Sequence, residues 1–285
     1  MVCPEGAAMK TTLFTLAASL FFSCSCVANS KIIATGGTSS IEGSAGGGIV
    51  PWAVINGYAS SDEMAATAFI SRVGVDDFTL NSIGASLTYD NNWEWSVARQ
   101  RFALDSIGGE LSQNIIAVKY RLAGQLLYTA LPQISLGAQY KKLHDFTLPQ
   151  AVGARDDSGL DVYLAASKVL FNQVAGRNLL LNATLRATKA NQTGLLGFGS
   201  ADNNNYRLMF EGSAALLLNY NVAIGAEFKQ KPDELAFADE QHWRDVFVAW
   251  FVNKRLSVTA GYVDLGSIAG LNNQQGYYLS VEGAW

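Results

Sequence analysis

The feature that most constrains the fold is an alternation of apolar and polar residues with a period of two. In residues 132–141, for example, Ile134, Leu136 and Tyr140 alternate with polar or small residues such as Gln133. A β-strand points successive side chains to opposite faces, so such a stretch has one apolar face and one polar face. The same pattern recurs in residues 82–89, 115–122, 179–188, 222–229, 256–262 and 277–285.

The alternation predicts about twelve antiparallel strands. Its phase is unclear in 160–171 and 243–253, so ten to fourteen strands fit the pattern. A second irregularity is that Trp93 and Trp95 share a face with Arg99 and Arg101. The expected strands are residues 65–76, 78–90, 92–104, 113–124, 131–143, 160–171, 178–190, 206–218, 221–231, 243–253, 255–265 and 276–285.

Strand length and composition favour a membrane barrel over a soluble sandwich, which alternation alone also fits. The apolar faces continue for about ten residues, as transmembrane strands require, whereas soluble strands average about five or six. Only 15% of residues are charged, fewer than a soluble surface normally carries. Aromatic residues lie near strand ends, as at membrane interfaces: Trp93, Trp95, Tyr120, Tyr140, Trp243, Tyr262, Tyr277 and Trp285.

The connections between the expected strands alternate between short and long. Tight turns are expected at residues 90–92, 219–221 and 253–254. Long polar loops are expected at residues 144–159, 191–205, 232–242 and 266–275. Outer-membrane barrels show this asymmetry, with short periplasmic turns and longer outer loops. The chain is therefore predicted to be all-β: a transmembrane antiparallel up-and-down β-barrel spanning residues 65–285.

The N-terminus predicts export. Met9 and Lys10 precede an apolar run over residues 11–22, and small residues ending at Ala28 to Ser30 follow it. This order is typical of a cleaved signal peptide, which we expect over residues 1–30, with translation starting at Met9. The chain's three cysteines all lie in this leader, so the mature protein is expected to have no disulfide and no thiolate metal site: Cys3, Cys24 and Cys26.

The last strand predicts recognition by the assembly machinery of the outer membrane. Tyr277, Leu279, Val281 and Trp285 share one face, and the final residue is aromatic. This pattern resembles the C-terminal signal recognised by the barrel-assembly machinery. The expected location is the Gram-negative outer membrane. The expected partners are outer-membrane lipid, lipopolysaccharide and the barrel-assembly machinery.

Residues 31–64 form a separate, glycine-rich N-terminal segment. Glycine is densest between residues 36 and 59, where it permits close backbone approach and unusual dihedral angles. No Gly-Lys-Ser/Thr follows, and no βαβ context is present, so neither a P-loop nor a dinucleotide site is indicated. Two interpretations remain open: a plug that enters the barrel, or an additional strand. The plug is favoured because it keeps the strand number even.

The chain resembles an uncharacterised family of proteobacterial outer-membrane proteins, catalogued as a domain of unknown function. The resemblance is carried by residues 36–52, Gly-Gly-Thr-Ser-Ser-Ile-Glu-Gly-Ser-Ala-Gly-Gly-Gly-Ile-Val-Pro-Trp, and by the barrel pattern after them. It covers essentially the whole mature protein. It implies a location and a fold, but no activity and no functional residues.

The polar faces of the strands supply the candidate site residues. In a barrel these side chains point into the lumen, where they either line a pore and tune its selectivity or pair across it and close it. With both charge signs present, the sequence leaves these two alternatives open. The expected lumen-lining residues are Lys119, Arg121, Lys141, Arg186, Glu211, Glu227, Lys229, Arg255 and Glu282.

Other chemistry has weak support in the sequence. The two histidines, His144 and His242, fall in expected outer loops, with no serine placed to form a nucleophile–base pair. Acidic residues in the loops match no defined calcium site, so neither a metal nor a cofactor is expected: Asp156, Asp157, Asp161, Asp233, Glu234, Asp239 and Glu240. A net charge of −4 argues against a nucleic-acid partner.

Three functions follow from these observations, in order of preference. The first is a narrow, porin-like channel for small solutes, with no enzymatic activity. The second is a closed barrel with a structural or surface-interaction role. The third, less favoured, is an outer-membrane enzyme that acts on lipid.

Overall fold

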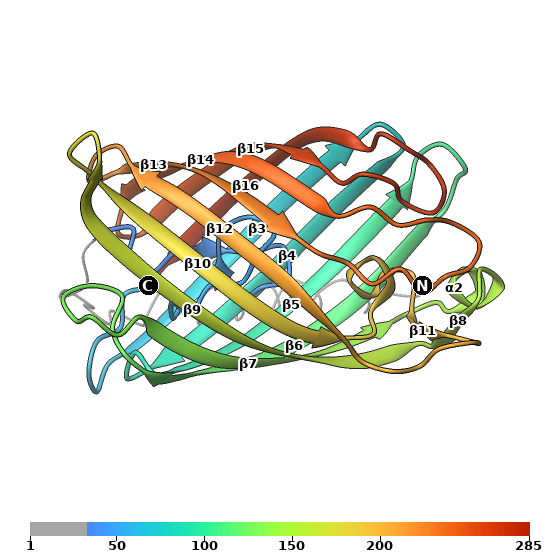
Figure 1. The fold of residues 1–285 in the computed structure, drawn as a ribbon, viewed down its shortest axis with the longest axis horizontal. Helices are drawn as coiled ribbons and strands as arrows, with labels where there is room; N and C mark the ends of the chain where they lie inside the picture. The colour runs from blue at the N-terminus through green and yellow to red at the C-terminus, as the bar shows by residue number, and fades with distance from the viewer. Residues whose placement is uncertain (1–32) are drawn as a thin grey trace, which may run out of the picture.

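Twelve antiparallel strands close into one barrel in the computed structural model, which describes residues 33–285 (Figure 1). Consecutive barrel strands pair with each other, and β16 pairs with β3 to close the ring. The expected signal peptide and the three cysteines lie outside the described residues. The barrel strands are β3 (Met64–Val75), β4 (Phe78–Tyr89), β5 (Trp93–Leu104), β6 (Glu110–Ala123), β7 (Gln133–Leu143), β9 (Ser158–Val174), β10 (Arg177–Thr188), β12 (Arg207–Leu217), β13 (Val222–Lys229), β14 (Trp243–Asn253), β15 (Leu256–Asp264) and β16 (Gln275–Ala284).

The predicted all-β, up-and-down barrel of about twelve strands is confirmed, and two doubts about its pattern are resolved. In β5, Trp93, Trp95, Arg99 and Arg101 are all exposed while every second residue between them is buried, so the strand keeps one phase throughout. In β14 the burial also alternates cleanly. That pattern was unclear in the sequence because the inward residues of β14 include large aromatic side chains.

The two ends of the barrel differ in their connections. At one end, here called the turn end, residues 90–92, 175–176, 218–221 and 254–255 form short turns, and β6 joins β7 through residues 124–132. At the other, the loop end, four long connections span residues 144–157, 189–206, 230–242 and 265–274. The loop end lies on the right in Figure 1, and the two remaining loop-end connections, residues 76–77 and 105–109, are short.

The long loops at the loop end carry the small elements outside the barrel. They comprise the short helix α2 (Thr147–Ala151), the 3-10 turn η1 (Asn191–Gly194) and the strands β8 (Ala154–Asp156) and β11 (Phe198–Ser200). The strands β8 and β11 pair as a separate two-stranded sheet. Among the described residues, no helix is long and apolar enough to cross a membrane.

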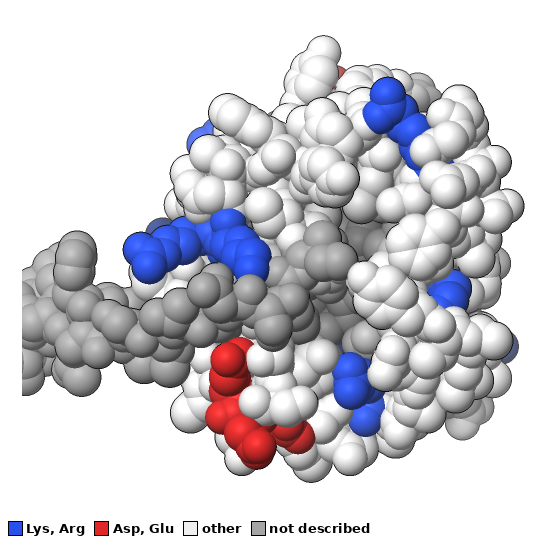
Figure 2. Space-filling view, turned by 90° about the vertical axis from the view of Figure 1, so that its left-hand side faces the viewer, with Lys and Arg blue, Asp and Glu red and all other residues white. Residues whose placement is uncertain are grey.

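The outer wall of the barrel is apolar. Ile83, Val97 and Ile116 are each more than half exposed, although such side chains are normally buried in a soluble protein. Trp93 packs against Tyr120 near the turn end, with ring centroids 4.4 Å apart. Seen from the turn end, charged side chains form a few separate groups on a mostly uncharged surface (Figure 2). Seven of the eight aromatic residues expected near strand ends are exposed to solvent at this outer wall.

Trp243 is the exception, because its side chain faces the lumen and is only 3% exposed. Its ring lies 5.8 Å from the Nζ atom of Lys229 and 5.7 Å from that of Lys231. The expectation that it joins an outer aromatic girdle was therefore wrong. It starts β14 in the inward phase, so its side chain points away from the outer wall.

The glycine-rich stretch lies inside the barrel and contributes no strand to the barrel wall. We call residues 36–59 the inner segment; every residue in it is buried. It contains a minimal hairpin of β1 (Thr38–Ser39) and β2 (Ala45–Gly46). Its contacts, described below, reach the inward face of strands all around the ring.

Gly137 provides a test of the lumen packing. It lies in β7 directly opposite Tyr163 of β9, and a Cβ atom at Gly137 would overlap the Tyr163 ring. Overpacking a tight site typically costs about 1–3 kcal/mol. We therefore expect Gly137→Ala to lower the free energy of unfolding by that amount in chemical denaturation followed by circular dichroism.

The matched control is Gly74→Ala in β3. A Cβ atom there meets nothing within 4 Å. We expect this variant to unfold at the wild-type denaturant concentration. Equal stability of the Gly137→Ala variant would show that Tyr163 does not cover Gly137.

Candidate functional site

The lumen wall is built from short polar side chains. A twelve-stranded barrel is too wide for such side chains to fill, so they leave a bore along its axis. That bore is the space in which the inner segment lies. The wall residues that are at most 7% exposed include Ser71, Ser82, Ser86, Ser96, Ser135, Ser167, Thr184, Ser213, Thr259 and Ser280.

The inner segment enters and leaves through the turn end. Ala34, just before it, lines a small cavity with Leu217 and Phe251, which lie near the turn-end limits of β12 and β14. After it, the carbonyl oxygen of Glu63 accepts a hydrogen bond of 2.9 Å from the N–H of Asp90 in the β4–β5 turn. Glu42 lies between these two limits and reaches lysine and arginine side chains in the loop-end half of the barrel. The segment is therefore a folded-back loop with Glu42 near its tip.

Carboxylates on the wall accept the backbone N–H groups of the inner segment. Glu227 of β13 is the main acceptor, and its Oε2 atom accepts bonds from the N–H groups of Gly48 and Ile49, both at 2.7 Å. The N–H of Val50 lies 3.3 Å from the same oxygen. A Cβ atom at Gly47 would overlap the Glu227 carboxylate, so this close approach requires glycine.

Two further carboxylates repeat this arrangement. Glu94 of β5 accepts bonds from the N–H groups of Ala45 at 3.0 Å and Asn56 at 2.8 Å, and so joins both arms of the loop. Glu282 of β16 accepts the N–H of Ser39 at 2.5 Å. Backbone donors that leave water need such partners, and bonds to ionised groups are the stronger kind.

Lys119 of β6 serves the carbonyl groups of the same loop. Its Nζ atom donates to the carbonyl oxygens of Ala45 and Val54, both at 3.0 Å, and lies 3.2 Å from the Glu94 carboxylate. The side chain is 1% exposed. Lys119 and Glu94 together therefore satisfy donors and acceptors on both arms of the inner segment.

Glu42 sits in a buried cluster of charges. It contacts Lys141, and it lies 3.1 Å from Arg186 and 2.9 Å from Lys229. The wall also contributes two carboxylates, because Arg186 pairs with Asp161 at 3.4 Å and with Glu211 at 2.6 Å. Three cations thus face three carboxylates, and the cluster is neutral only when Glu42 is present.

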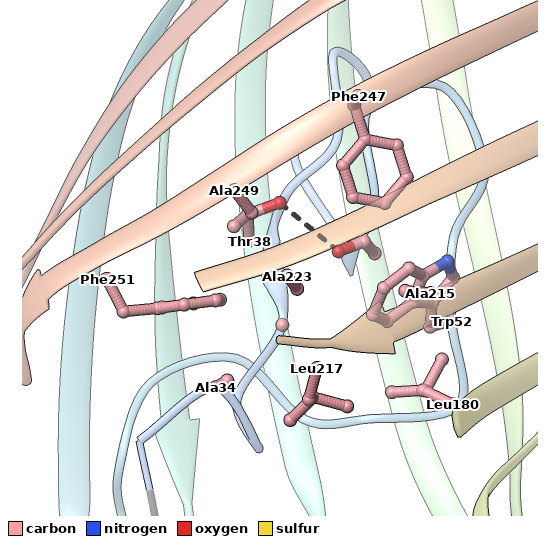
Figure 3. Close-up of a pocket in the computed structure, with 12 residues that line it drawn as sticks. Ala34, Thr38, Trp52, Leu180, Ala215, Leu217, Ala223, Phe247, Ala249 and Phe251 are labelled. Atoms are coloured by element: carbon pink, nitrogen blue, oxygen red, sulfur yellow. Dashed lines mark hydrogen bonds between the residues drawn. The ribbon is translucent and has the colours of Figure 1, made fainter. Parts of the chain in front are cut away.

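Nearer the turn end, the contact between the inner segment and the wall is apolar (Figure 3). Trp52 of the inner segment shares a small cavity with Leu180, Phe247 and Phe251 of the wall. The indole N–H of Trp52 donates to Ser213 at 2.9 Å, so its polar edge is satisfied as well. The dashed line in the figure is the bond of 3.3 Å from the Thr38 hydroxyl to the carbonyl oxygen of Gly46.

A second layer covers the mouth at the loop end. Residues 190–199 are all buried, and the carbonyl oxygen of Thr193 accepts a bond of 3.1 Å from Lys141. Above them, Lys231 and Glu240 form an ion pair of 2.9 Å. Burial raises the pKa of the Glu240 carboxyl and lowers that of the Lys231 ammonium, because both charges lose solvent. The long loop expected at residues 191–205 is present, but its first part is buried over the mouth of the barrel.

The structure brings seven of the nine expected lumen residues inside the barrel. Arg121, by contrast, is half-buried near the turn-end limit of β6. Arg255 is exposed in the turn between β14 and β15, so its expected lumen position was wrong; the strand ends before its side chain can turn inward. The seven residues, each at most 7% exposed, are Lys119, Lys141, Arg186, Glu211, Glu227, Lys229 and Glu282.

Three important carboxylates were missed in the sequence. Asp161 was assigned to an acidic outer loop, but it lies in β9 and faces the lumen. Glu94 alternates with Trp93 and Trp95, and this alternation was a signal that could have found it. Glu42 lies in the glycine-rich segment, where no periodicity indicates a direction.

The remaining candidates lie away from the lumen. Two acidic residues of the outer loops form ion pairs, with Asp156 at 2.9 Å from Lys189 and Glu234 at 2.5 Å from Arg207. The two histidines are exposed at the loop end. The four residues of the expected C-terminal assembly signal face outward on or just after β16, and their role in assembly stays a prediction: Tyr277, Leu279, Val281 and Trp285.

A closed barrel with an exposed apolar outer wall and a lumen lined by polar side chains has the architecture of a transmembrane β-barrel. The chain belongs to the family described as "Protein of unknown function (DUF3034)", whose model matches residues 35–282. This agrees with the resemblance inferred from the sequence. No curated protein matches the chain.

Several solved structures are similar in fold. A KdgM porin is 10% identical, with 77% of this chain and 99% of that chain covered and a TM-score of 0.48. The Acinetobacter baumannii outer membrane protein Omp33 is 11% identical, with 79% and 100% covered and a TM-score of 0.48. The Escherichia coli outer membrane phospholipase A is 8% identical, with 77% and 91% covered and a TM-score of 0.38. At these identities the likeness concerns the fold alone.

Glu42→Gln tests the charged cluster. The substitution removes one of three negative charges and leaves three buried cations with two carboxylates. Breaking a buried pair by removing one partner costs roughly 3–5 kcal/mol. We expect the free energy of unfolding to fall by about 3 kcal/mol, measured by chemical denaturation in detergent micelles.

Asp157→Asn is the comparison for this variant. Asp157 pairs with Lys142 at 3.6 Å, but both side chains are exposed. Exposed pairs contribute little, so this variant should unfold like the wild type. Equal effects of the two substitutions would show that Glu42 does not hold the cluster together.

Proposed function

We propose that the protein is an outer-membrane barrel that passes small solutes and is closed by its own inner segment. The observation that carries this proposal is that wall carboxylates bind the backbone of the segment, led by Glu227. The segment fills the bore, so solutes pass only when it is displaced. The channel and the inner segment that closes it thus belong to the same chain.

The outer wall supports a membrane location. Apolar side chains such as Ile83, Val97 and Ile116 project from it without any covering element. A closed barrel leaves no unpaired strand edge, so its backbone is satisfied within hydrocarbon. The difference between the two ends supports an orientation with the loop end outside the cell and the turn end in the periplasm.

The nature of the contacts supports a closure that opens. The segment is held by hydrogen bonds to charged and hydroxyl groups, such as Ala53 N–H to Ser167 at 2.9 Å. Water replaces such bonds when the surfaces separate, so the net cost is about 0.5–1.5 kcal/mol for a bond to a hydroxyl group and about 1.5–3 kcal/mol for a bond to a charged group. Outside the apolar contact around Trp52, the wall beside the segment carries many hydroxyl and charged groups, which water would hydrate after the segment leaves.

A permanently closed barrel with a surface role is the second candidate. The buried residues 190–199 favour it, because they cover the loop-end mouth in addition to the inner segment. A channel and a permanently closed barrel differ in their conductance after the inner segment is weakened. Weakening the inner segment raises conductance in a channel and leaves a permanently closed barrel without conductance.

Planar-bilayer conductance of a Glu42→Gln/Glu227→Gln double variant tests the proposal. The wild type should show rare or no current steps. The double variant should show discrete steps at least tenfold more often, because the tip and the main backbone acceptor are both weakened. Asp157→Asn, outside the lumen, should behave like the wild type.

A disulfide supplies the reciprocal experiment. The Cβ position of Gly43 lies 3.1 Å from the Cβ atom of Ala98 in β5, somewhat shorter than the roughly 3.5–4.5 Å between disulfide-linked residues. Gly43 also has a φ of 95°, which strains a cysteine at this position, so an unboiled gel shift first verifies that the cross-linked variant has folded. Added to the double variant, Gly43→Cys/Ala98→Cys should suppress the steps when oxidised and restore them on reduction. Steady conductance in the wild type that the cross-link leaves unchanged would contradict closure by the inner segment.

Location is tested separately, by membrane fractionation and by electrophoresis of unboiled and boiled samples. We expect the protein in the outer-membrane fraction, with an unboiled band that shifts on heating. A monodisperse protein in buffer without detergent would contradict the membrane barrel itself.

A further inference from the structure

A groove crosses the outer wall over strands β16, β3, β4, β5 and β6. Its floor consists of small side chains in register, with Gly283 opposite Ala68 and Ala68 opposite Ala85. Larger apolar residues border it, including Ile70 and Ile116. The groove is thus a recess in a surface that is elsewhere covered by large apolar side chains.

Cationic side chains lie where the groove approaches the loop end. Arg99 lines the groove itself, together with Asn114, which is directly opposite it on β6. One step closer to the loop end, Arg72 is opposite Asn81, and Asn81 is opposite Arg101. All three arginines are exposed on the outward face of their strands.

These arginines have no partner in the part of the chain that the structure describes. Among the described residues 33–285, no ion pair or hydrogen bond involves the guanidinium group of Arg72, Arg99 or Arg101. Glu110 is the nearby outward-facing acidic residue of β6, opposite Ala103 rather than an arginine. A cation on the lipid face of a barrel is destabilising, and the penalty increases with depth. Three of them, one on β3 and two on β5 with β4 between these strands, therefore indicate an anionic ligand in the surrounding lipid.

We propose that this surface binds a phosphorylated glycolipid of the outer leaflet, of the lipid A type. The inference rests on the proposed membrane location and orientation, in which the loop end faces outward. One acyl chain would lie along the small-residue floor at Ala68 and Ala85. The phosphate groups would contact Arg72, Arg99 and Arg101.

The groove and the arginines together fit one lipid molecule, with its acyl chain in the groove and its phosphate groups at the arginines. The planar guanidinium group binds phosphate oxygens through two parallel N–H donors, and this geometry makes arginine the preferred phosphate ligand. Neighbouring strands lie about 4.8 Å apart, so arginines on β3 and β5 are separated by roughly 10 Å. This spacing suits a ligand with more than one phosphate, and Asn81 and Asn114 add hydrogen-bonding groups for a polar head group.

Binding to the full chain in detergent micelles tests the proposal. The probes are bisphosphorylated hexa-acyl lipid A, the same lipid without phosphate, and phosphatidylglycerol, each detected by native mass spectrometry. We expect the wild type to bind lipid A at least tenfold more tightly than the other two. The triple variant Arg72→Gln/Arg99→Gln/Arg101→Gln should lose this preference, and Ala85→Phe should weaken binding by filling the groove.

Arg244→Gln is the matched control, because Arg244 is exposed on β14, outside the groove. It should bind lipid A like the wild type. Equal binding by the triple variant would overturn the proposal, and equal affinity for phosphatidylglycerol would overturn the choice of a glycolipid. All variants face outward, so an unboiled gel shift first verifies that each one has folded.

The two proposals fail in different ways. A chain that does not enter a bilayer removes the membrane location and the lipid site together. A chain that enters the bilayer and conducts as proposed, but binds lipid A without the arginines, removes the lipid site alone.

Discussion

Backbone N–H and C=O groups that leave water must find partners, and this requirement shapes the protein at two levels. In the wall, the closed ring of strands satisfies it without a free edge. Inside the ring, the inner segment has almost no regular structure of its own, because its only hairpin pairs two residues with two. Its backbone is satisfied instead by side chains of the wall, chiefly Glu227, Glu94 and Lys119. The wall residues are therefore specific for one path of the inner segment.

The ion pairs around Glu42 fix the position of the inner segment in the lumen more than they stabilise the folded protein. Buried charges lose their hydration, and this loss offsets much of their mutual attraction. A displaced segment would, however, leave Lys141, Arg186 and Lys229 with too few carboxylates. The cluster therefore favours the one position of the inner segment in which Glu42, near the tip, lies beside these three cations.

The barrel could be predicted from sequence because each strand faces lipid on one side and polar contacts on the other. Apolar and polar residues must therefore alternate along the strand. Each of the twelve strands has this pattern. The path of the inner segment could not be predicted, because glycine-rich sequence permits many backbone conformations. Trp243 was misplaced because it is the first residue of β14, where one residue of error reverses the face. Asp161 was assigned to the preceding loop, but β9 already begins at Ser158. Contacts between Glu42 and three separate strands depend on tertiary structure alone.

The small side chains of the lumen wall and the folded-back shape of the inner segment together bear on how the molecule is assembled. Both limits of the segment are at the turn end, so the chain passes through the bore without crossing from one mouth to the other. Filling the lumen consequently requires no threading of a free terminus. The ring of strands and its contents are topologically independent, and the last step of maturation can be the insertion of a loop into a barrel that has already closed.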